Sequence, residues 1–143
     1  MRSWRPYVRV VPGAPLISIM EKKKILVVED DAFLRRAYKA KLGKGEYEII
    51  EAVDGDDAIK KVKETMPDVI ILDLIMPKKD GFQFLNELSK QKVKKVIPIF
   101  VVSNLGQETD IKEAEKYGVK KYFVKSDTSI AEVANTVSDF LKK

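Results

Sequence analysis

The feature that most constrains the fold is a regular alternation of short apolar runs with segments of helical periodicity. The runs are rich in Val, Ile and Leu and have the length of buried strands, whereas the segments between them repeat apolar residues at helical spacing. Strands that alternate with helices favour a parallel sheet with right-handed crossovers and helices on both faces. We therefore expect an α/β fold, a doubly wound sheet of five parallel strands with five helices. The expected strands are residues 25–28, 47–52, 69–72, 97–102 and 122–124.

Start and stop signals support the helical segments. Gly43 follows the first segment, where glycine commonly ends a helix, and the second segment stops before Pro67. At the start of the last segment, Ser129 and Glu132 have the spacing of a capping box. The expected helices are residues 32–42, 54–66, 82–88, 111–117 and 130–141.

Composition limits the chemistry that the chain can perform. Its 143 residues suit a single domain with a real core, and they include neither cysteine nor histidine. Disulfides, thiolate metal sites, a histidine nucleophile and the usual transition-metal sites are therefore excluded. A metal ion would need oxygen ligands, which favours Mg²⁺ or Mn²⁺ over Zn²⁺.

The formal net charge of +5 does not indicate a nucleic-acid-binding surface. Part of the excess lies in residues 1–20, which contain three arginines and no acidic residue. In the remaining chain, lysine is interleaved with glutamate and aspartate along the whole length, which is typical of a solvated surface with mixed charges. We expect no direct contact with nucleic acid.

Residues 1–20 are expected to lie outside the domain, which would comprise residues 21–143. The leader contains three prolines and shows no sustained period, and its apolar stretch Val8–Val11 is cut off by Pro12. That stretch is too short for a secretory signal or a membrane span. We interpret the leader as disordered, or as an extension before a natural start at Met20, and expect a soluble cytoplasmic protein.

Charged residues follow three of the expected strands. Glu29 and Asp30 end the first run, Asp73 ends the third and Lys125 follows the fifth. The carboxyl ends of parallel strands meet at one edge of a sheet, where such folds bind ligands. Each acid alone could simply cap a helix or turn, but converging carboxylates repel one another unless a cation is present. The pattern therefore predicts a divalent-cation site facing a carboxylate that can be phosphorylated.

Four segments in register resemble the receiver domain of two-component response regulators, the chemotaxis-type phosphoacceptor domain. The resemblance covers residues 22–143 and implies a flavodoxin-like fold with strand order 2-1-3-4-5. The matching segments are Ile-Leu-Val-Val-Glu-Asp-Asp at 25–31, Val-Ile-Ile-Leu-Asp-Leu-Ile-Met-Pro at 69–77 with Gly81 beyond it, Val-Val-Ser-Asn at 101–104 and Tyr-Phe-Val-Lys at 122–125.

The resemblance implies a metal site. Asp73 would be the phosphoacceptor and, with Asp30, a direct ligand of Mg²⁺, or alternatively of Mn²⁺. Glu29 would act through a water molecule, and the backbone carbonyl of Ile75 would complete the protein ligands. Asp31 then falls outside the acidic pair and is expected to cap the first helix.

The resemblance also implies a switch. Lys125 would pair with the acceptor carboxylate and then with the phosphoryl group, Ser103 would hydrogen-bond a phosphoryl oxygen, and the rotamer of Tyr122 would report phosphorylation. The expected readout surface, about residues 107–142, comprises the fourth helix, the fifth strand and the fifth helix.

These roles predict a single-domain response regulator, because the domain extends to Lys143. It would take its phosphoryl group from a sensor histidine kinase or a histidine phosphotransfer protein. Its output would be an unknown downstream protein, with a phosphorylation-dependent homodimer left open. It would promote its own phosphorylation and dephosphorylation without turning over a free substrate.

Three departures from the family pattern affect these expectations. Ser126 stands where a proline, commonly joined by a cis bond, follows the lysine; a cis bond before a residue other than proline costs about 2.5–4 kcal/mol. Asn104 replaces a small residue, which narrows access to the acceptor. Ile75 and Leu105 flank the site, and we expect them to hinder the attacking water and to lengthen the phosphoryl lifetime.

Other functions fit these residues less well. An aspartyl-phosphate phosphohydrolase needs a second acid two residues after its nucleophile, and Ile75 at that place argues against this class. A dinucleotide-binding module is disfavoured because Gly43-Lys44-Gly45 follows a helix, not the first strand. A phosphorylation-independent interaction domain remains an alternative, which Ser126 and Asn104 support.

Overall fold

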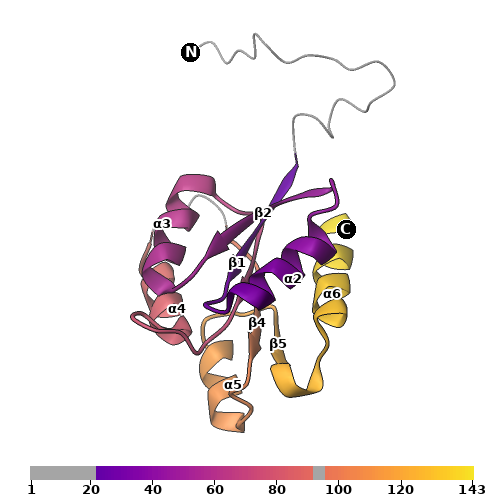
Figure 1. Cartoon of the computed structure of the whole chain (residues 1–143). Helices are drawn as coiled ribbons and strands as arrows, with labels where there is room; N and C mark the ends of the chain where they lie inside the picture. The colour runs from indigo at the N-terminus through magenta and orange to yellow at the C-terminus, as the bar shows by residue number, and fades with distance from the viewer. Residues whose placement is uncertain (1–21, 92–95) are drawn as a thin grey trace, which may run out of the picture.

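The structure, a computed structural model, describes residues 22–91 and 96–143. Its five parallel strands form one sheet in the order β2-β1-β3-β4-β5, flanked by helices on both faces (Figure 1). The predicted doubly wound α/β fold and its strand order are confirmed. The predicted leader, residues 1–20, lies outside the described residues.

The strands coincide with the expected apolar runs at β2 and β3, whereas β1 begins two residues earlier, at Lys23, β5 begins one residue earlier, at Lys121, and β4 is displaced. That strand begins at Ile99 and ends at Ser103, so the expected range 97–102 was wrong by two residues at its start. Pro98 has no amide hydrogen and cannot donate to the ladder, although its carbonyl accepts from Ile70 N at 3.0 Å. The strands are β1 (Lys23–Val28), β2 (Tyr47–Ala52), β3 (Val69–Leu72), β4 (Ile99–Ser103) and β5 (Lys121–Val124).

Side chains satisfy free amides of the first turn at the start of α2, α3, α4 and α6. At α5, which begins at Glu108 and not at the expected residue 111, Gln107 makes no such bond. The expected cap is confirmed at Asp31, whose carboxylate accepts from the amides of Phe33 and Leu34. The α-helices are α2 (Ala32–Leu42), α3 (Gly55–Thr65), α4 (Gly81–Lys90), α5 (Glu108–Glu115) and α6 (Ile130–Lys142), and a short 3₁₀ helix, η1, covers Lys125–Asp127.

The capping box lies elsewhere than the sequence pattern indicated. Ser129 Oγ accepts from Glu132 N, which is one half of the expected box. The reciprocal pair of bonds is formed at the start of α4, where Asp80 accepts from Gln83 N and the Gln83 side chain accepts from Asp80 N. Asp80 precedes Gly81, so this box holds the loop that leaves β3.

Two apolar layers sandwich the sheet, because successive side chains of each strand point to opposite faces. On one face Leu26, Ile70 and Val101 pack with residues of α3 and α4, and on the other Val27 and Ile71 pack with residues of α2 and α6. Figure 1 shows the same two groups of helices on opposite sides of the sheet. β3 is buried along its whole length, as expected for a central strand covered on both faces.

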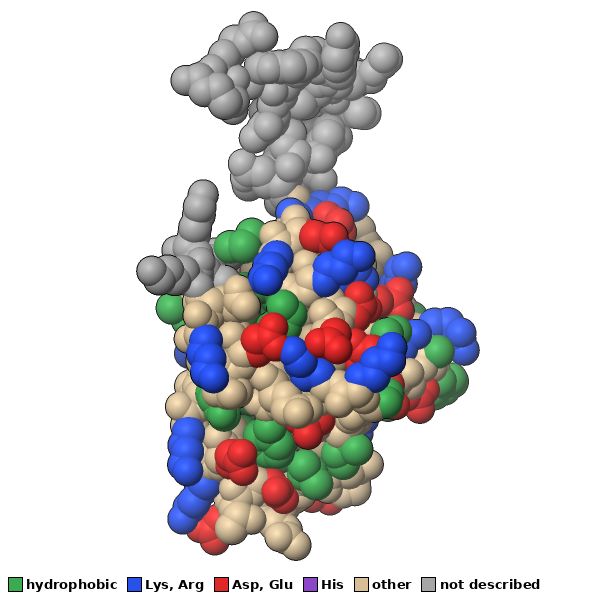
Figure 2. Space-filling model, turned by 90° about the vertical axis from the view of Figure 1, so that its left-hand side faces the viewer, with side chains coloured by type: hydrophobic (Ala, Val, Ile, Leu, Met, Phe, Trp, Pro, Cys, Tyr) green, Lys and Arg blue, Asp and Glu red, His purple; other side chains and the backbone are tan. Residues whose placement is uncertain are grey.

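The surface carries both signs of charge. On the face shown in Figure 2, side chains of Lys and Arg are interspersed with those of Asp and Glu. None of the described helices combines the length and the apolar character that crossing a membrane would require.

The strand register brings the carboxyl ends together. Val28 of β1 lies beside Leu72 of β3, and Asp73 N donates to the Val28 carbonyl at 3.0 Å. At the same carboxyl ends of the next two strands, Ser103 of β4 lies beside Val124 of β5. The predicted site residues therefore leave the sheet at one edge.

Candidate functional site

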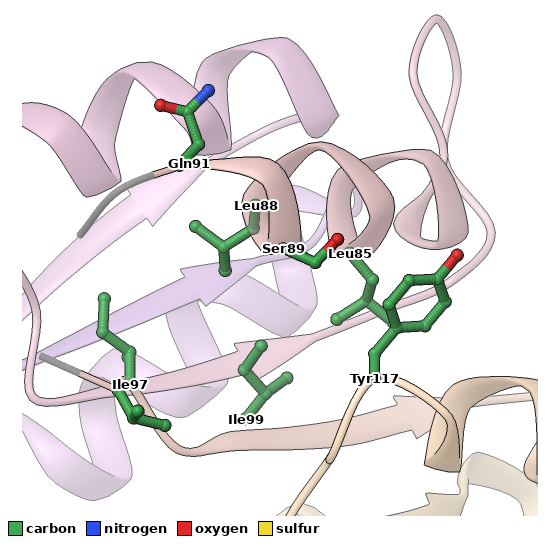
Figure 3. A pocket seen from close by; sticks show the side chains of 8 residues that line it. Leu85, Leu88, Ser89, Gln91, Ile97, Ile99 and Tyr117 are labelled. Atoms are coloured by element: carbon green, nitrogen blue, oxygen red, sulfur yellow. The ribbon is translucent and has the colours of Figure 1, made fainter.

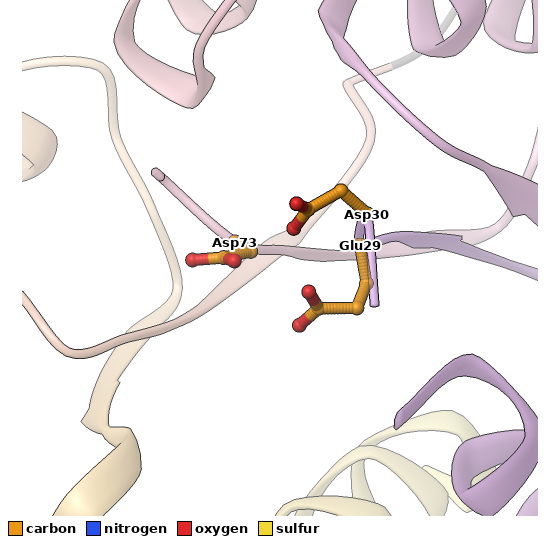
Figure 4. Close-up of side chains that lie close together, drawn as sticks. All are labelled: Glu29, Asp30 and Asp73. Carbon is orange, nitrogen blue, oxygen red and sulfur yellow. The ribbon is translucent and has the colours of Figure 1, made fainter. Parts of the chain in front are cut away.

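Three carboxylates converge at this edge. Figure 4 shows the side chains of Glu29 and Asp30, which follow β1, and of Asp73, which follows β3, extending into a common space. One oxygen from each lies within 4.8 Å of the others. Glu29 is 2% and Asp73 5% exposed, whereas Asp30 is exposed to solvent. Water therefore screens the repulsion inside the cluster poorly, and the three oxygens form a donor set suited to a hard divalent cation.

Lys125 balances part of this charge. Its Nζ donates to Glu29 Oε1 at 2.8 Å and to Asp73 Oδ2 at 3.1 Å. Burial alone would lower the pKa of Lys125, but its bond to Glu29 and the charge of Asp73 outweigh that effect and raise it. The expected pairing with Asp73 is present, and the bond to Glu29 is an addition that the sequence did not predict.

Glu29 is the most perturbed acid of the site. Burial and the negative charge of Asp73 raise its pKa to about 7, against the opposing effects of Lys125 and of the Asp31 amide. That amide donates to Glu29 Oε2 at 3.1 Å, so both oxygens of the carboxylate are held. The pKa of Tyr38 is also raised, by burial first and then by the charges of Glu29 and Asp73.

Asp73 is oriented by the backbone that follows it. Its Oδ1 accepts from Ile75 N at 3.1 Å, while its Oδ2 accepts from Lys125. The predicted metal ligand from Ile75 is the carbonyl of that residue, and this role stays a prediction. The Ile75 side chain is 52% exposed at the edge of the site.

An open cavity of about 340 Å³ lies over the acidic cluster. Asn104 is among its lining residues, and its narrowing of access to the acceptor stays a prediction. Ser103 is not among them: it is fully buried, so its predicted contact with a phosphoryl oxygen would require the loop to move. The lining residues are Glu29, Asp30, Asp31, Leu34, Asp73, Ile75, Asn104 and Lys125.

Ser103 and Tyr122 are connected through one residue. Leu105 N donates to Ser103 Oγ at 3.2 Å, and the Tyr122 hydroxyl donates to the Leu105 carbonyl. Burial and the charge of Asp110 raise the pKa of Tyr122. The phenol is therefore a protonated donor that bonds to the loop after β4.

The peptide between Lys125 and Ser126 is trans, because the described part of the chain contains no cis peptide bond. Ser126 therefore follows Lys125 without the cis bond that a proline at this place would commonly take. The chain turns into η1 directly after β5, and Lys125 still reaches both buried carboxylates.

Sequence reasoning missed Arg35, which holds the backbone of the acidic loop. Its Nη1 donates to the carbonyls of Glu29 and Asp30 at 2.8 and 3.0 Å. A spacing of four from Asp31 places Arg35 one helical turn below the cap, a signal that could have identified it.

A second cavity, of about 190 Å³, lies between α4, the start of β4 and the residues after α5 (Figure 3). Its lining includes Leu85, Leu88, Ile99 and Tyr117, with Ser89 and Gln91 as polar members. Since no lining side chain is ionised at neutral pH, we assign no phosphoryl chemistry to it.

Comparison with known proteins agrees with this geometry. The family model of the response regulator receiver domain matches residues 25–136. The chemotaxis protein CheY of Thermotoga maritima is 35% identical over 119 residues, which cover 81% of this chain and 98% of that protein. The probable transcriptional regulator ycf27 of Porphyridium aerugineum is 36% identical over 106 residues, or 74% of this chain. The match spans only 43% of that regulator's length.

Two solved structures bear on the site. The crystal structure of the phosphorylated cyanobacterial phytochrome response regulator RcpA has a TM-score of 0.71 and 30% identity, and the match covers 83% of this chain and 91% of that one. The Mn²⁺-bound form of response regulator Rcp1 has a TM-score of 0.72 and 28% identity, with 83% and 94% covered.

Proposed function

Because the chain belongs to the family of response regulator receiver domains, we propose that it accepts a phosphoryl group on Asp73 from a histidine kinase or histidine phosphotransfer protein. One observation carries the proposal: a buried aspartate lies within 3.1 Å of a lysine ammonium and beside two further carboxylates. A receiver domain signals by its phosphorylation state, so we propose no turnover of a free substrate.

The donor set fits a divalent cation. Glu29, Asp30 and Asp73 would hold Mg²⁺, with the carbonyl of Ile75 as a further ligand and Glu29 acting through water. Burial first, and then the negative charge of Asp73, raise the pKa of Glu29 despite its bond to Lys125, and a divalent cation would offset both effects. When bound, the ion would supply positive charge against the repulsion between Asp73 and an incoming phosphoryl group. The Mn²⁺-bound relative indicates that Mn²⁺ is an alternative.

Transfer would replace one bond to phosphorus by another. The N–P bond of a phosphohistidine breaks, a bond forms between an Asp73 carboxylate oxygen and phosphorus, and the donor imidazole keeps the electron pair of the broken bond. Lys125 would follow the phosphoryl oxygens, which suits a compact charge on a flexible side chain. In-line positioning of donor and acceptor supplies much of the rate.

Switching would proceed through the two backbone hydrogen bonds of Leu105, one with Ser103 and one with Tyr122. A phosphoryl group on Asp73 offers the Ser103 hydroxyl a new partner, which draws the loop inward and changes the carbonyl that Tyr122 contacts. Such coupling is typically about 1–3 kcal/mol. The surface that responds would be α5, β5 and α6, and α5 suits this role because Ala114 is its one buried residue.

The partners and the functional unit belong to the same proposal. The domain would comprise residues 21–143, with residues 1–20 outside it. The output would be a downstream protein or a phosphorylation-dependent homodimer that recognises the surface of α5, β5 and α6.

The buried Ser103 and the cavity-lining Asn104 favour one alternative, an interaction domain that keeps the fold without the switch. Such a domain would bind its partner equally well before and after exposure to a phosphoryl donor.

The test is to incubate the full chain with Mg²⁺ and acetyl phosphate and to follow its intact mass. We expect the mass of one phosphoryl group to be added to the wild-type protein and not to Asp73→Asn. Asp139→Asn, an exposed aspartate on α6, is the matched control and should be modified like the wild type. Addition to the Asp73→Asn protein, or no addition to the wild type, would overturn the proposal.

A further inference from the structure

Arg35 makes three hydrogen bonds that join β2 to the acidic loop. Its Nε donates to Glu51 Oε1 of β2 at 3.1 Å, and its Nη1 donates to the backbone carbonyls of Glu29 and Asp30. The Arg35 side chain is 15% exposed, and its bonds to Glu51 and to the Glu29 carbonyl are partly buried, whereas its bond to the Asp30 carbonyl is exposed. The guanidinium thus lies against the backbone of the loop, while the Glu29 and Asp30 carboxylates extend toward Asp73 (Figure 4).

The peptide between Asp30 and Asp31 is held from both ends. Its carbonyl accepts from Arg35 Nη1 at 3.0 Å, and its N–H donates to Glu29 Oε2 at 3.1 Å. A chain of hydrogen bonds therefore runs from the guanidinium through one peptide to the Glu29 carboxylate. Bonds in such a chain polarise one another, and rotation of this peptide would release Glu29 Oε2, leaving the carboxylate held only through Oε1 by Lys125.

Glu51 sets the orientation of the guanidinium. Its two oxygens lie 3.1 Å from Arg35 Nε and 3.8 Å from Lys39 Nζ. A guanidinium presents its donors in a rigid plane, and a lysine ammonium cannot reproduce bonds to a carboxylate and two carbonyls at once.

We propose that Arg35 is a positioning residue, which holds the Asp30–Asp31 peptide so that the carboxylates of Glu29 and Asp30 are preorganised for a divalent cation. This inference rests on the proposed function of the site. Outer contacts that orient ligands typically change metal affinity by about 10- to 100-fold, and we expect an effect of that size.

The sign of the effect separates positioning from simple charge. A positive charge near a cation site opposes cation binding, so removing it should tighten binding if charge is all that matters. Loss of positioning should weaken binding. Arg35→Gln therefore moves the affinity in opposite directions under the two explanations.

The chain offers a matched control in Arg36. This next residue is exposed, and its side chain forms no hydrogen bond or ion pair with the described residues, so Arg36→Gln makes the same charge change without the contacts. Arg35→Lys keeps the charge and loses the planar donors. Glu51→Gln keeps Arg35 and weakens the partner that orients it.

The experiment titrates Mg²⁺ into each full-length variant by calorimetry, at a temperature where thermal unfolding shows all of them folded. We expect Arg35→Gln to lower the Mg²⁺ affinity at least about tenfold and Arg35→Lys to restore it only in part. Glu51→Gln should lower the affinity less, and Arg36→Gln should leave it unchanged or slightly raised. Wild-type or tighter binding by Arg35→Gln, or full recovery by Arg35→Lys, would overturn the inference.

A second readout needs no metal. Amide hydrogen exchange in the presence of a chelator should be faster at Asp31 in Arg35→Gln than in the wild type or in Arg36→Gln, because the peptide that donates to Glu29 is freed. Equal exchange at Asp31 overturns the inference. If the wild-type protein binds no Mg²⁺, the proposed function fails, while the exchange at Asp31 still decides whether Arg35 holds this peptide.

Discussion

Lys125 Nζ lies 3.1 Å from Asp73 Oδ2, so the residue after β5 already contacts the carboxylate after β3. The same nitrogen lies 2.8 Å from Glu29 Oε1. One ammonium therefore serves two buried acids that differ in their proposed roles, a metal ligand and a phosphoacceptor. Changes at these residues should affect metal binding and phosphorylation differently.

Removing the Lys125 ammonium should slow phosphorylation without weakening Mg²⁺ binding. In Lys125→Ala we expect phosphorylation by acetyl phosphate to slow on the order of a hundredfold, because no side-chain cation would then face the incoming phosphoryl group. Mg²⁺ binding should be maintained or tightened, since the cluster loses its internal positive charge. Phosphorylation kinetics and calorimetry measure the two effects. Lys60→Ala, at an exposed position on α3, is the control, and parallel losses in both measurements would contradict the separation.

Ile75 should control how long the phosphoryl group survives. Its side chain is half exposed beside Asp73, where we expect it to hinder an attacking water. In Ile75→Asn the amide could orient that water, and we expect dephosphorylation to accelerate by roughly tenfold, less than a positioned general base provides. Loss of label from the purified phosphoprotein measures the rate, and an unchanged decay would refute the role of Ile75.

The stability of the metal-free protein should fall as the pH rises from 4.5 to about 7. Folding raises the pKa of Glu29 over this interval, so the folded state binds a proton more tightly than the unfolded state does. The resulting stabilisation is complete below the unfolded pKa and is lost as the pH passes the folded one. Thermal unfolding in the presence of a chelator measures this change.

Two additions sharpen the pH experiment. Glu29→Gln does not titrate, so its unfolding temperature should vary less across the interval. Added Mg²⁺ should stabilise the wild type more at pH 8 than at pH 5, because the cation needs the ionised carboxylate. Stability that rises through this interval without metal would be the contrary result.

The close contact at Gly81 should make this position intolerant of a side chain. A Cβ there would lie 2.6 Å from Leu74 Cα and 2.7 Å from the Asp73 carbonyl oxygen, both backbone atoms of the acceptor loop. We expect Gly81→Ala to destabilise the protein by about 1–3 kcal/mol and to slow phosphorylation.

Gly106 provides the comparison for Gly81. A Cβ at Gly106 would meet Val124 Cγ1 at 3.4 Å, which is an ordinary contact with a side chain. Chemical denaturation should therefore show a smaller loss for Gly106→Ala, and equal losses in the two variants would contradict the packing argument.

The agreement between sequence and fold has a local cause. Runs such as Val69–Leu72 are covered on both faces, so they are continuously apolar and recognisable without knowledge of their neighbours. The errors also have local causes. Pro98, which cannot donate to the ladder, precedes the start of β4, and at Ser129 only one of the two bonds of the expected box forms.

The convergence of Glu29, Asp30, Asp73 and Lys125 was determined by the order of the residues, because carboxyl ends of parallel strands must share an edge of the sheet. Only the tertiary structure decided that Lys125 also binds Glu29 and that Ser103 is buried beneath the loop. It likewise revealed that Arg35 holds the acidic backbone. These contacts depend on side-chain directions and loop paths. Both arise from packing among residues far apart in the chain, so they produce no periodic pattern in the amino-acid sequence.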